Sequence, residues 1–568
     1  MKPLTLKDYD IIKPYLQKAD YEGYNSNYVT MMMWNHEYHI EYEIHDHYCV
    51  MMHNYKGHRF FAMPFTTEEY YKEAIDYMLS YSRDHGFPFM IDCAIAPFVE
   101  KIKKIYGKQF LYERTRDFDD YIYDKNMLMT LSGKKMQKRR NHYNAFLKEY
   151  PQHVYRPLTI EKDYDLIIDC LTKWETDKEN SESLMSEVYG IMYMLSSNHN
   201  LGFKMGGIFI EEELKAFIMA SPLTHQTIQI HVEKADKSIR GLYPAIQKEF
   251  LEHEYPESLF VNREEDMGLE NLRISKTQLH PCKMVEKYRV HENKTSVEKA
   301  SENDKQEVKR LWLERFEDET KESTEFYFNA CYKTDNTYVL RFQNKILSAL
   351  QIVPFSVEGK TESYFVLGVS TSQAFEGQGC MKKLLMNVLH LYEGKCIYLQ
   401  AYHPDIYRPF GFMDSHYHQV VVVDQESYKA IKPAEALNDN KQLLSLYESF
   451  TSHYHSYRNR TAQYYVKYLL PRCIAFDDKV MSFYLNGQVI GYAIYHEDEK
   501  QVYVNELIYT NDSLDAIISS LCVMNDKTLV VECDLNASIS GDKHKILTMM
   551  CNQNSDIPMD MRYINEIS

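Results

Sequence analysis

The sequence predicts an α/β protein made of four units of similar layout, two in each half of the chain, each with a mixed central sheet flanked by helices. Two observations support this prediction. One pattern occurs four times along the chain, namely two β-rich runs joined by a short polar turn and followed by strand or helix material. The two halves are separated by residues 291–305, a polar stretch without Phe, Tyr or Trp that is typical of a linker.

The four hairpins provide the first elements of the four units. We expect them at residues 48–65, 206–220, 338–353 and 481–495, with turns at 54–57, 211–213, 343–345 and 486–487. In the second of the four repeats, which lies in the N-terminal half, a strand at 227–235 and a helix at 239–255 follow the hairpin. In the third of the four repeats, a strand at 364–371 precedes a helix from Gly379, whose apolar residues recur at i, i+3, i+4, i+7, i+8 and i+11.

Length, charge and cysteine usage restrict the class of protein. A chain of 568 residues is too long for one hydrophobic core, so several compact units are expected. The net charge of −17 argues against coating nucleic acid or anionic membrane with the whole surface. The 11 cysteines include no C-x-x-C pair, and no run of about 18 apolar residues appears. We therefore expect a cytoplasmic protein with reduced cysteines and without a transmembrane segment or signal peptide.

The sharpest chemical motif is the segment Glu376-Gly377-Gln378-Gly379-Cys380, between a predicted strand and a predicted helix. Two glycines let the backbone approach a bulky anion without Cβ clashes. The free N–H groups and the dipole of the following helix then favour a pyrophosphate. A G-x-G motif alone is also typical of an ordinary tight strand-to-helix turn, so its context has to decide.

That context resembles a known superfamily. The run GVSTSQAFEGQGCMKKLL at 368–385, followed by IYRPFGF at 406–412, resembles the GNAT N-acetyltransferases and, within them, the Eis-like (enhanced intracellular survival) enzymes. The segment VNELIYTNDSLDAII at 504–518 and the ending MMCNQNSDIPMDMRYINEIS at 549–568 resemble the same family. The resemblance implies a tandem GNAT-like fold and transfer of acetyl from acetyl-CoA, as co-substrate, to a primary amine of a small molecule or peptide.

The resemblance also assigns roles to individual residues. Backbone groups of Val369 and Thr371 would bind the pantetheine arm, and the loop Glu376–Cys380 would hold the pyrophosphate. Tyr407 would be the general acid that protonates the departing thiolate, because a phenol with a pKa near about 10 stays protonated and can still donate. The chain-terminal carboxylate of Ser568 would be the base. Glu376 departs from the family pattern, since relatives carry Arg there, and would repel pyrophosphate unless it points away.

The N-terminal half carries a different signature. The runs DFDDYIY at 117–123, LSGKKMQKRRNH at 131–142, HVEKA at 231–235, NREEDMG at 262–268 and LRISK at 272–276 resemble an uncharacterised family related to the catalytic domain of phosphatidylglycerol lysyltransferases. Those are tandem GNAT-like folds that move an aminoacyl group from tRNA to a lipid head group. The candidate substrate-binding residues in this half are Lys138, Arg139, Glu233, Glu265, Asp266, Arg273 and Lys276.

Two interpretations of these residues remain open. The basic cluster at 134–140 could hold a phosphate-rich donor such as a tRNA end, or it could be a solvated helix face. Glu265, Asp266, Arg273 and Lys276 could bind an amino-acid-like zwitterion, or they could be an ion-pair network that holds a turn. Arg240-Gly241 occupies the place of a pyrophosphate loop, but one glycine gives poor support for CoA there.

The predicted domains are 1–290, with two GNAT-like subdomains, the linker 291–305, a GNAT acetyltransferase domain at 306–420, and a degenerate second GNAT-like domain with the tail at 421–568. The fourth unit has no glycine loop, so we expect it to bind no CoA of its own. Two rival functions remain, namely aminoacyl transfer from tRNA centred on the N-terminal half, and a degenerate scaffold without catalysis. An oligomer is possible.

A metal site is not predicted. His45, His47, Cys49 and His53 would share one face of a strand, which invites a metal interpretation. No complete ligand set with a known spacing appears around them, and His36-Glu37-Tyr38-His39 lacks one residue of an H-E-x-x-H motif.

Overall fold

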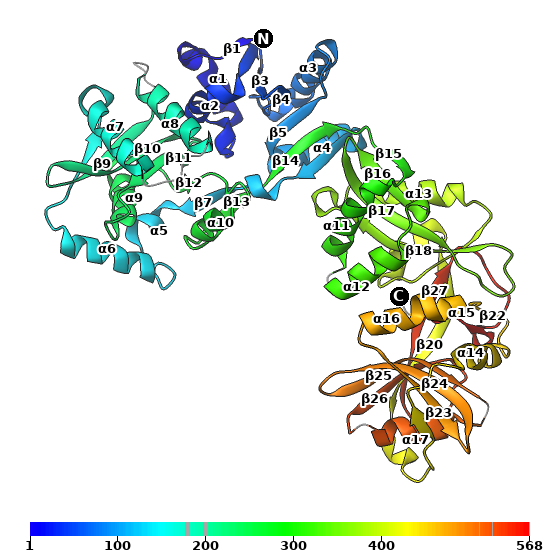
Figure 1. The fold of residues 1–568 in the computed structure, drawn as a ribbon. Helices are drawn as coiled ribbons and strands as arrows, with labels where there is room; N and C mark the ends of the chain where they lie inside the picture. The colour runs from blue at the N-terminus through cyan, green and yellow to red at the C-terminus, as the bar shows by residue number, and fades with distance from the viewer. Residues whose placement is uncertain (177–181, 197–200, 317–318, 511, 525, 567–568) are drawn as a thin grey trace. The chain divides into compact units, whose positions relative to one another are not determined.

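The computed structural model describes residues 1–176, 182–196, 201–316, 319–510, 512–524 and 526–566, and the chain divides into two compact units, residues 1–293 and 294–568 (Figure 1). Each unit has its own sheets and its own hydrophobic cores. No helix among the described residues is both long enough and apolar enough to cross a membrane.

The first sheet of the first unit has the strand order β1-β2-β3-β4-β5-β14-β6 over the described residues. These strands are β1 (Lys2–Pro3), β2 (Glu41–Ile44), β3 (Cys49–Tyr55), β4 (His58–Phe61), β5 (Met90–Ile95), β14 (Lys287–Glu292) and β6 (Phe110–Arg114). Its helices are α1 (Tyr9–Ala19), α2 (Tyr28–Tyr38), α3 (Tyr71–Asp84) and α4 (Ala96–Tyr106). Each of these helices buries apolar side chains in the same core as the sheet.

The second sheet of the first unit has the order β13-β7-β12-β11-β10-β9-β8 over the described residues. Its strands are β13 (Lys283–Val285), β7 (Asp120–Asp124), β12 (Phe260–Asn262), β11 (Thr227–Ala235), β10 (Glu213–Pro222), β9 (Lys204–Ile210) and β8 (Val154–Leu158). Its helices are α5 (Lys125–Thr130), α6 (Gln137–Glu149), α7 (Ile160–Thr176), α8 (Glu182–Leu195), α9 (Leu242–His253) and α10 (Glu270–Thr277).

One large sheet organises the second unit, with the order β15-β16-β17-β18-β19-β27-β20-β26-β25-β24-β23-β21 over the described residues. The strands of its first part are β15 (Ser296–Lys299), β16 (Thr337–Phe342), β17 (Lys345–Pro354), β18 (Ser363–Thr371), β19 (Cys396–Leu399) and β20 (Met413–Val423). Those of its second part are β21 (Glu435–Leu437), β23 (Lys479–Leu485), β24 (Gln488–Glu497), β25 (Gln501–Tyr509), β26 (Thr528–Cys533) and β27 (Gly541–Cys551).

Helices cover both faces of this large sheet. They are α11 (Lys305–Arg315), α12 (Lys321–Phe326), α13 (Cys380–Leu391), α14 (Leu443–Thr451), α15 (Ala462–Tyr464), α16 (Leu470–Ala475) and α17 (Leu514–Met524). α17 packs in one core with Val421 and Val531, whereas α14 packs in another core with Tyr492 and Ile508. The two helices therefore lie on opposite faces of the same strands, as Figure 1 shows.

The predicted fourfold repetition is present. In each copy, three antiparallel strands are followed by a helix that returns the chain to a strand parallel to the third. The four copies are β2-β3-β4 with α3 and β5, β9-β10-β11 with α9 and β12, β16-β17-β18 with α13 and β19, and β23-β24-β25 with α17 and β26. The mixed α/β fold class predicted from the sequence is therefore confirmed.

The hairpin turns have the backbone that short hairpins require. Lys56 and Gly57 have φ angles of +49° and +86°, and Asn486 and Gly487 have +52° and +78°. Positive φ at both central residues matches the twist of the flanking strands, so these turns set the register of the hairpins. In the second copy, Glu211 and Glu212 adopt the same backbone without glycine, at +50° and +67°.

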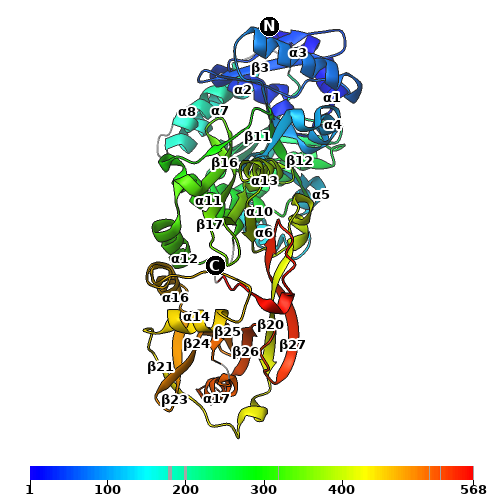
Figure 2. The ribbon, with the colours of Figure 1, turned by 90° about the vertical axis from the view of Figure 1, so that its right-hand side faces the viewer.

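The two copies of the second unit exchange strands, which the sequence did not indicate. β27, from the end of the chain, lies between β19 and β20, and β20 also pairs with β26 of the fourth copy. Figure 2 shows β20 and β27 side by side. The predicted boundary at 420/421 therefore falls inside β20, and the two copies share one continuous sheet instead of forming separate domains.

Most of the segment predicted as a linker, 291–305, has regular structure. β14 extends to Glu292, and β15 pairs with β16 as an edge strand of the large sheet. Only Asn293, Lys294 and Thr295 separate β14 from β15. The segment is polar because edge strands and helix starts are exposed to solvent on one side, and this exposure gives the composition of a linker without its irregular backbone.

Candidate functional site

The predicted cofactor loop connects β18 to α13. Gly379 is the N-cap of α13 with φ +79°, and Gly377 has φ +72°. A Cβ atom built on either glycine would meet nothing within 4 Å. The backbone of the loop is therefore exposed to open space directly in front of the first turn of a twelve-residue helix. Unpaired N–H groups and the positive end of the helix dipole make this place suited to a phosphate group.

β18 separates from β19 near its C-terminal end, where the cofactor loop begins. It pairs with β19 only from Ser363 to Val366, so among the described strands none pairs with residues 367–371 on that side. On its other side, β18 contains a bulge opposite β17, at Gly368, whose φ is +62°. A Cβ atom on Gly368 would lie 2.5 Å from Trp312, so only glycine fits under this ring. Val369 and Thr371, the predicted pantetheine contacts, follow this bulge.

The C-terminal end of α11 holds the loop from below. Arg315 donates through Nε to the carbonyl oxygen of Thr371 at 2.5 Å, and its Nη2 lies 3.3 Å from Oε2 of Glu376. Glu314 accepts from the backbone N–H of Gln373. Glu376 is therefore paired with a cation 61 residues earlier in the chain, and its side chain is 65% exposed. Arg315 could not be identified from the sequence, because nothing in the sequence pattern of α11 distinguishes it from a surface arginine.

Tyr407 lies between two short 3-10 turns, Pro404–Ile406 and Arg408–Phe410, after β19. Its ring packs edge-on against Phe412, with the ring centroids 6.3 Å apart. Burial raises the pKa of Tyr407 above its ordinary value. The raised pKa keeps the hydroxyl protonated at neutral pH, so it can donate to an incoming group.

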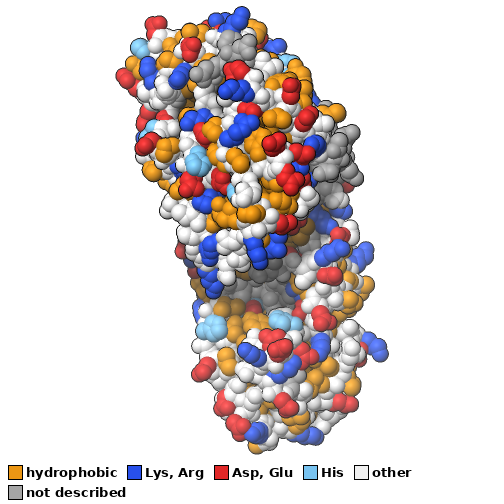
Figure 3. Space-filling view, turned by 90° about the vertical axis from the view of Figure 1, so that its left-hand side faces the viewer, with side chains coloured by type: hydrophobic (Ala, Val, Ile, Leu, Met, Phe, Trp, Pro, Cys, Tyr) orange, Lys and Arg blue, Asp and Glu red, His pale blue; other side chains and the backbone are white. Residues whose placement is uncertain are grey.

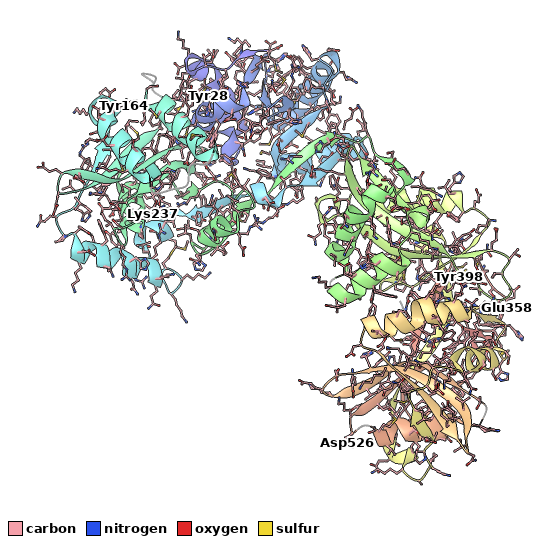
Figure 4. The ribbon with its side chains drawn as sticks, in the orientation of Figure 1. Tyr28, Tyr164, Lys237, Glu358, Tyr398 and Asp526 are labelled. Carbon is pink, nitrogen blue, oxygen red and sulfur yellow. The ribbon has the colours of Figure 1, made fainter. Side chains whose placement is uncertain are left out.

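The described end of the chain is fixed against the strands that open at the site. β28 (Arg562–Tyr563) pairs in parallel with β22 (Ser456–Tyr457). Ile564 packs in one core with Phe365 of β18 and Tyr398 of β19, which is labelled in Figure 4. Ser568, the predicted base, lies outside the described residues, so its role stays a prediction.

The basic cluster of the first unit divides into an outer and an inner part. Lys134, Lys135 and Lys138 are exposed. Arg139 turns inward from α6 and donates to Oε1 of Gln247 at 2.7 Å, and Gln247 donates to Glu233 at 3.4 Å. Burial lowers the pKa of Arg139 to about 10. Of these four residues, the exposed lysines are therefore the ones placed to meet a phosphate-rich partner.

The acidic residues at 264–266, next to the turn before α10, also divide into two groups. Asp266 is fully buried and accepts from Arg273 at 2.9 Å through both carboxylate oxygens, and from Tyr121 at 2.6 Å. Burial alone would raise its pKa, but these hydrogen bonds outweigh burial and bring the pKa of Asp266 to about 2. Arg273 also donates to Asp117 at 2.6 Å. This arrangement is that of an ion-pair network holding the turn before α10.

Glu264 and Glu265 form the second group, on the other side of that turn. Glu265 accepts from Tyr24 at 2.7 Å, and Glu264 accepts from Gln229 at 2.8 Å. Burial and the neighbouring Glu265 raise the pKa of Glu264 to about 8. Lys276 donates to the backbone carbonyl of Arg263 at 2.6 Å. Glu265 and Lys276 were predicted from the sequence. Glu264 and Tyr24 were not, and Tyr24 lies 241 residues before its partner Glu265.

The histidines considered for metal binding have other contacts. His45 and His47 lie in the connection between β2 and β3 and stack on Tyr48 and Tyr70, whereas His53 stacks on Phe60. Cys49 and His53 therefore share a face of β3 as expected, but the expectation is wrong for His45 and His47, because the strand begins only at Cys49. Among the residues that the structure describes, no group of three or more His, Cys, Asp or Glu side chains is arranged to hold a metal ion.

Two family models match the chain, one in each unit. Residues 18–291 match the family described as phosphatidylglycerol lysyltransferase, C-terminal, and residues 296–413 match the family described as acetyltransferase (GNAT) domain. The second unit therefore carries a GNAT acyltransferase domain. Its matched range contains β18, the glycine loop, α13 and Tyr407. The first unit resembles the phosphatidylglycerol lysyltransferase domain over nearly its whole length.

Individual relatives are distant. An uncharacterised protein of Mycoplasmoides gallisepticum is 24% identical over 192 residues, which cover 34% of this chain and 61% of that protein. A solved protein of unknown function from Bacteroides thetaiotaomicron is 28% identical over 51% of this chain and 99% of its own, with a TM-score of 0.48. L-PGS from Bacillus licheniformis is 14% identical over 50% and 92%, with a TM-score of 0.38. Eis1 from Mycobacterium abscessus is 13% identical over 45% and 72%, with a TM-score of 0.34.

Proposed function

We propose that the GNAT domain of the second unit transfers an acetyl group from acetyl-CoA to a primary amine. The observation that carries this proposal is the open loop at Gly377 and Gly379 in front of α13, within the range that matches the GNAT family. Both glycines have left-handed φ angles and empty space where a side chain would stand. This is the geometry that a backbone needs to approach a pyrophosphate.

The residues around the loop have complementary tasks in this proposal. The unpaired edge of β18 after Val366 binds the pantetheine arm through backbone groups of Val369 and Thr371. Bound acetyl-CoA supplies the acetyl group as a thioester. Tyr407 donates its proton to the sulfur that departs as the new C–N bond forms and the C–S bond breaks. The raised pKa of Tyr407 keeps that proton available at neutral pH.

The amine must lose a proton before it attacks, since its own pKa is near about 10. The tail supports a base at the chain end, because Ile564 packs against Phe365 and Tyr398 on the two strands that diverge at the site. We therefore propose that the carboxylate of Ser568 or a water relay takes this proton. The acceptor is proposed to be a cationic small molecule or peptide amine, which suits a chain of net charge −17. On the face shown in Figure 3, acidic and basic side chains are interspersed and no patch of one sign dominates.

The test is release of free thiol from acetyl-CoA by the full chain in the presence of a panel of primary amines, namely polyamines, amino sugars and lysine-containing peptides. We expect amine-dependent release by the wild type and none by Gly379→Glu, whose side chain would fill the open space of the loop. Amine-independent release only, or equal release by both proteins, would contradict the proposal.

We propose a second candidate function for the first unit on the basis of its family resemblance. This function is aminoacyl transfer from a charged tRNA. The observation that favours it is the half-buried group of Glu264, Glu265 and Tyr24, whose carboxyl oxygens can accept hydrogen bonds from an amino group. The exposed lysines 134, 135 and 138 could meet the tRNA backbone.

Filter retention of charged tRNA by the full chain tests the second candidate. We expect weaker binding and a smaller dependence on salt when the three exposed lysines are changed to Gln. Equal retention of the wild type and the triple variant would exclude these lysines as the tRNA contact.

A further inference from the structure

The cofactor loop of this chain has an acidic side chain where a phosphate is to bind. Glu376 directly precedes Gly377, and a carboxylate beside a pyrophosphate costs binding free energy by like-charge repulsion. In the structure, this carboxylate is 3.3 Å from Nη2 of Arg315, whose side chain is 24% exposed. A cation therefore already lies beside the loop, and it belongs to α11.

Arg315 is held in place by a contact that does not involve Glu376. Its Nε donates to the carbonyl oxygen of Thr371, the last residue of β18, at 2.5 Å. Glu314, the preceding residue, binds the backbone N–H of Gln373 in the same loop. Consecutive residues of one helix thus fix both sides of the turn that leads to the glycines. Nε is occupied by the carbonyl oxygen of Thr371. The other edge of the guanidinium, with Nη2, pairs with Glu376 and is the part that a phosphate can bind instead.

The pairing of Arg315 with Glu376 is easy to exchange. Glu376 is 65% exposed, and an ion pair with such an exposed partner contributes little net free energy. A guanidinium bound to a phosphate through two parallel N–H···O bonds is among the stronger charged contacts in proteins. A pyrophosphate that arrives at the loop can therefore displace the carboxylate from Arg315.

We infer that Arg315 is the pyrophosphate-binding cation of this site and that Glu376 occupies it when no cofactor is bound. The inference rests on the proposed use of acetyl-CoA by the second unit and adds to it a residue outside the glycine loop. Arg315 replaces the positive charge that the loop itself lacks, and Glu376 returns to solvent when the pyrophosphate takes its place. Donors without a pyrophosphate gain nothing from Arg315.

The experiment compares three thioesters with the full chain, namely acetyl-CoA, acetyl-dephospho-CoA and S-acetylpantetheine. Dissociation constants are measured by calorimetry, or by competition where binding is weak, for the wild type, Arg315→Met, Glu376→Gln and Lys309→Met. Lys309 is the matched control, because it lies on the same helix and loses an ion pair with Glu325 but has no contact with the loop among the described residues.

We expect Arg315→Met to weaken acetyl-CoA and acetyl-dephospho-CoA by about ten- to a hundredfold, the range of a charge-assisted hydrogen bond, and to leave S-acetylpantetheine unchanged. Glu376→Gln should tighten the first two donors, and Lys309→Met should alter none. Arg315→Lys should restore part of the affinity, since it keeps the charge and loses the fork.

Three outcomes overturn the inference, and they differ from failure of the proposed function. If Arg315→Met weakens all three donors equally, or weakens none, Arg315 only supports the fold of the loop or has no role in binding. An effect on acetyl-CoA that is absent for acetyl-dephospho-CoA assigns Arg315 to the 3′-phosphate and also overturns it. If the wild type binds neither of the two nucleotide thioesters, the acetyltransferase proposal itself fails together with this inference.

Discussion

Arg460 and Glu506 form an ion pair that is completely buried in the second unit, with two hydrogen bonds of 2.9 Å and 2.7 Å between guanidinium and carboxylate. Tyr492 donates to the same carboxylate at 2.8 Å, and Arg460 donates to the backbone carbonyl of Asn565 at 2.9 Å. The pair therefore joins β25 to the C-terminal tail. In this tail, Ile564 packs with Phe365 of β18 and Tyr398 of β19, the strands of the proposed site.

Arg460→Met should destabilise the second unit by about 3–5 kcal/mol, because it leaves Glu506 charged, buried and unpaired. Chemical denaturation of the second unit, followed by the fluorescence of Trp312, measures this loss. Arg310→Met is the control, since Arg310 is 51% exposed and its ion pairs should contribute about 1 kcal/mol or less. A cost of Arg460→Met as small as that of the control would show that Glu506 takes a proton or finds another partner.

The hairpins, the strand at Thr227–Ala235 and the helix after Gly379 could be predicted because local pattern determines them. Turn residues such as Asn486-Gly487 fix a hairpin, and the 3.6-residue period of Leu384, Leu385 and Val388 fixes the buried face of α13. The insertion of β27 between β19 and β20 could not be predicted, because pairing between residues 398 and 551 depends on tertiary packing and leaves no local signal.

The candidate site was predictable to the same extent. The loop Glu376–Cys380 was visible because glycine spacing is local, and its backbone angles and open space are consistent with the predicted use. Arg315 was not visible, because its pairing with Glu376 depends on how α11 packs on β18. In the first unit, Arg273 and Asp266 were predicted as either a binding site or a network, and their short mutual bonds favour the network.

Tyr407→Phe should lower the turnover of an accepted amine by about 10²–10⁴-fold, the usual contribution of a general acid, and leave acetyl-CoA affinity unchanged. Steady-state kinetics and calorimetry measure the two effects separately. Tyr402→Phe is a matched control in the same loop, because Tyr402 is 88% exposed. Since burial raises the pKa of Tyr407, the wild-type rate should not fall with rising pH below about pH 10. A decline between pH 7 and 9, or equal rates for both variants, would exclude Tyr407 as the acid.

Glu264→Gln should change how the stability of the first unit depends on pH. The pKa of Glu264 is about 8 in the folded chain and about 4.3 when unfolded, so the folded state holds this proton more tightly. Its contribution to stability is complete below about pH 4.3 and is lost as pH rises through about 8. Glu264→Gln should therefore be more stable than the wild type at pH 9 and similar near pH 4.

Hydrogen exchange of β11 peptides at several pH values measures this effect, because β11 contains Gln229, the partner of Glu264. The exposed Glu257→Gln variant serves as the control and should follow the wild type at every pH. Parallel pH profiles for the wild type and Glu264→Gln would mean that Glu264 is ionised in the folded chain at neutral pH.

The most direct test of the acetyltransferase proposal compares two glycines at opposite ends of α13. Gly379 and Gly394 have φ angles of +79° and +80°, and a Cβ atom on either would meet nothing within 4 Å. Glutamate at either position therefore imposes a similar backbone strain, but only at Gly379 does it enter the proposed pyrophosphate site.

Thermal unfolding is measured with and without acetyl-CoA for the wild type, Gly379→Glu and Gly394→Glu. At about 100 times its Kd, the ligand should stabilise the second unit by about 2.7 kcal/mol in the wild type and in Gly394→Glu, and not at all in Gly379→Glu. The same shift in all three proteins, or no shift in the wild type, would contradict the proposal that this loop binds acetyl-CoA.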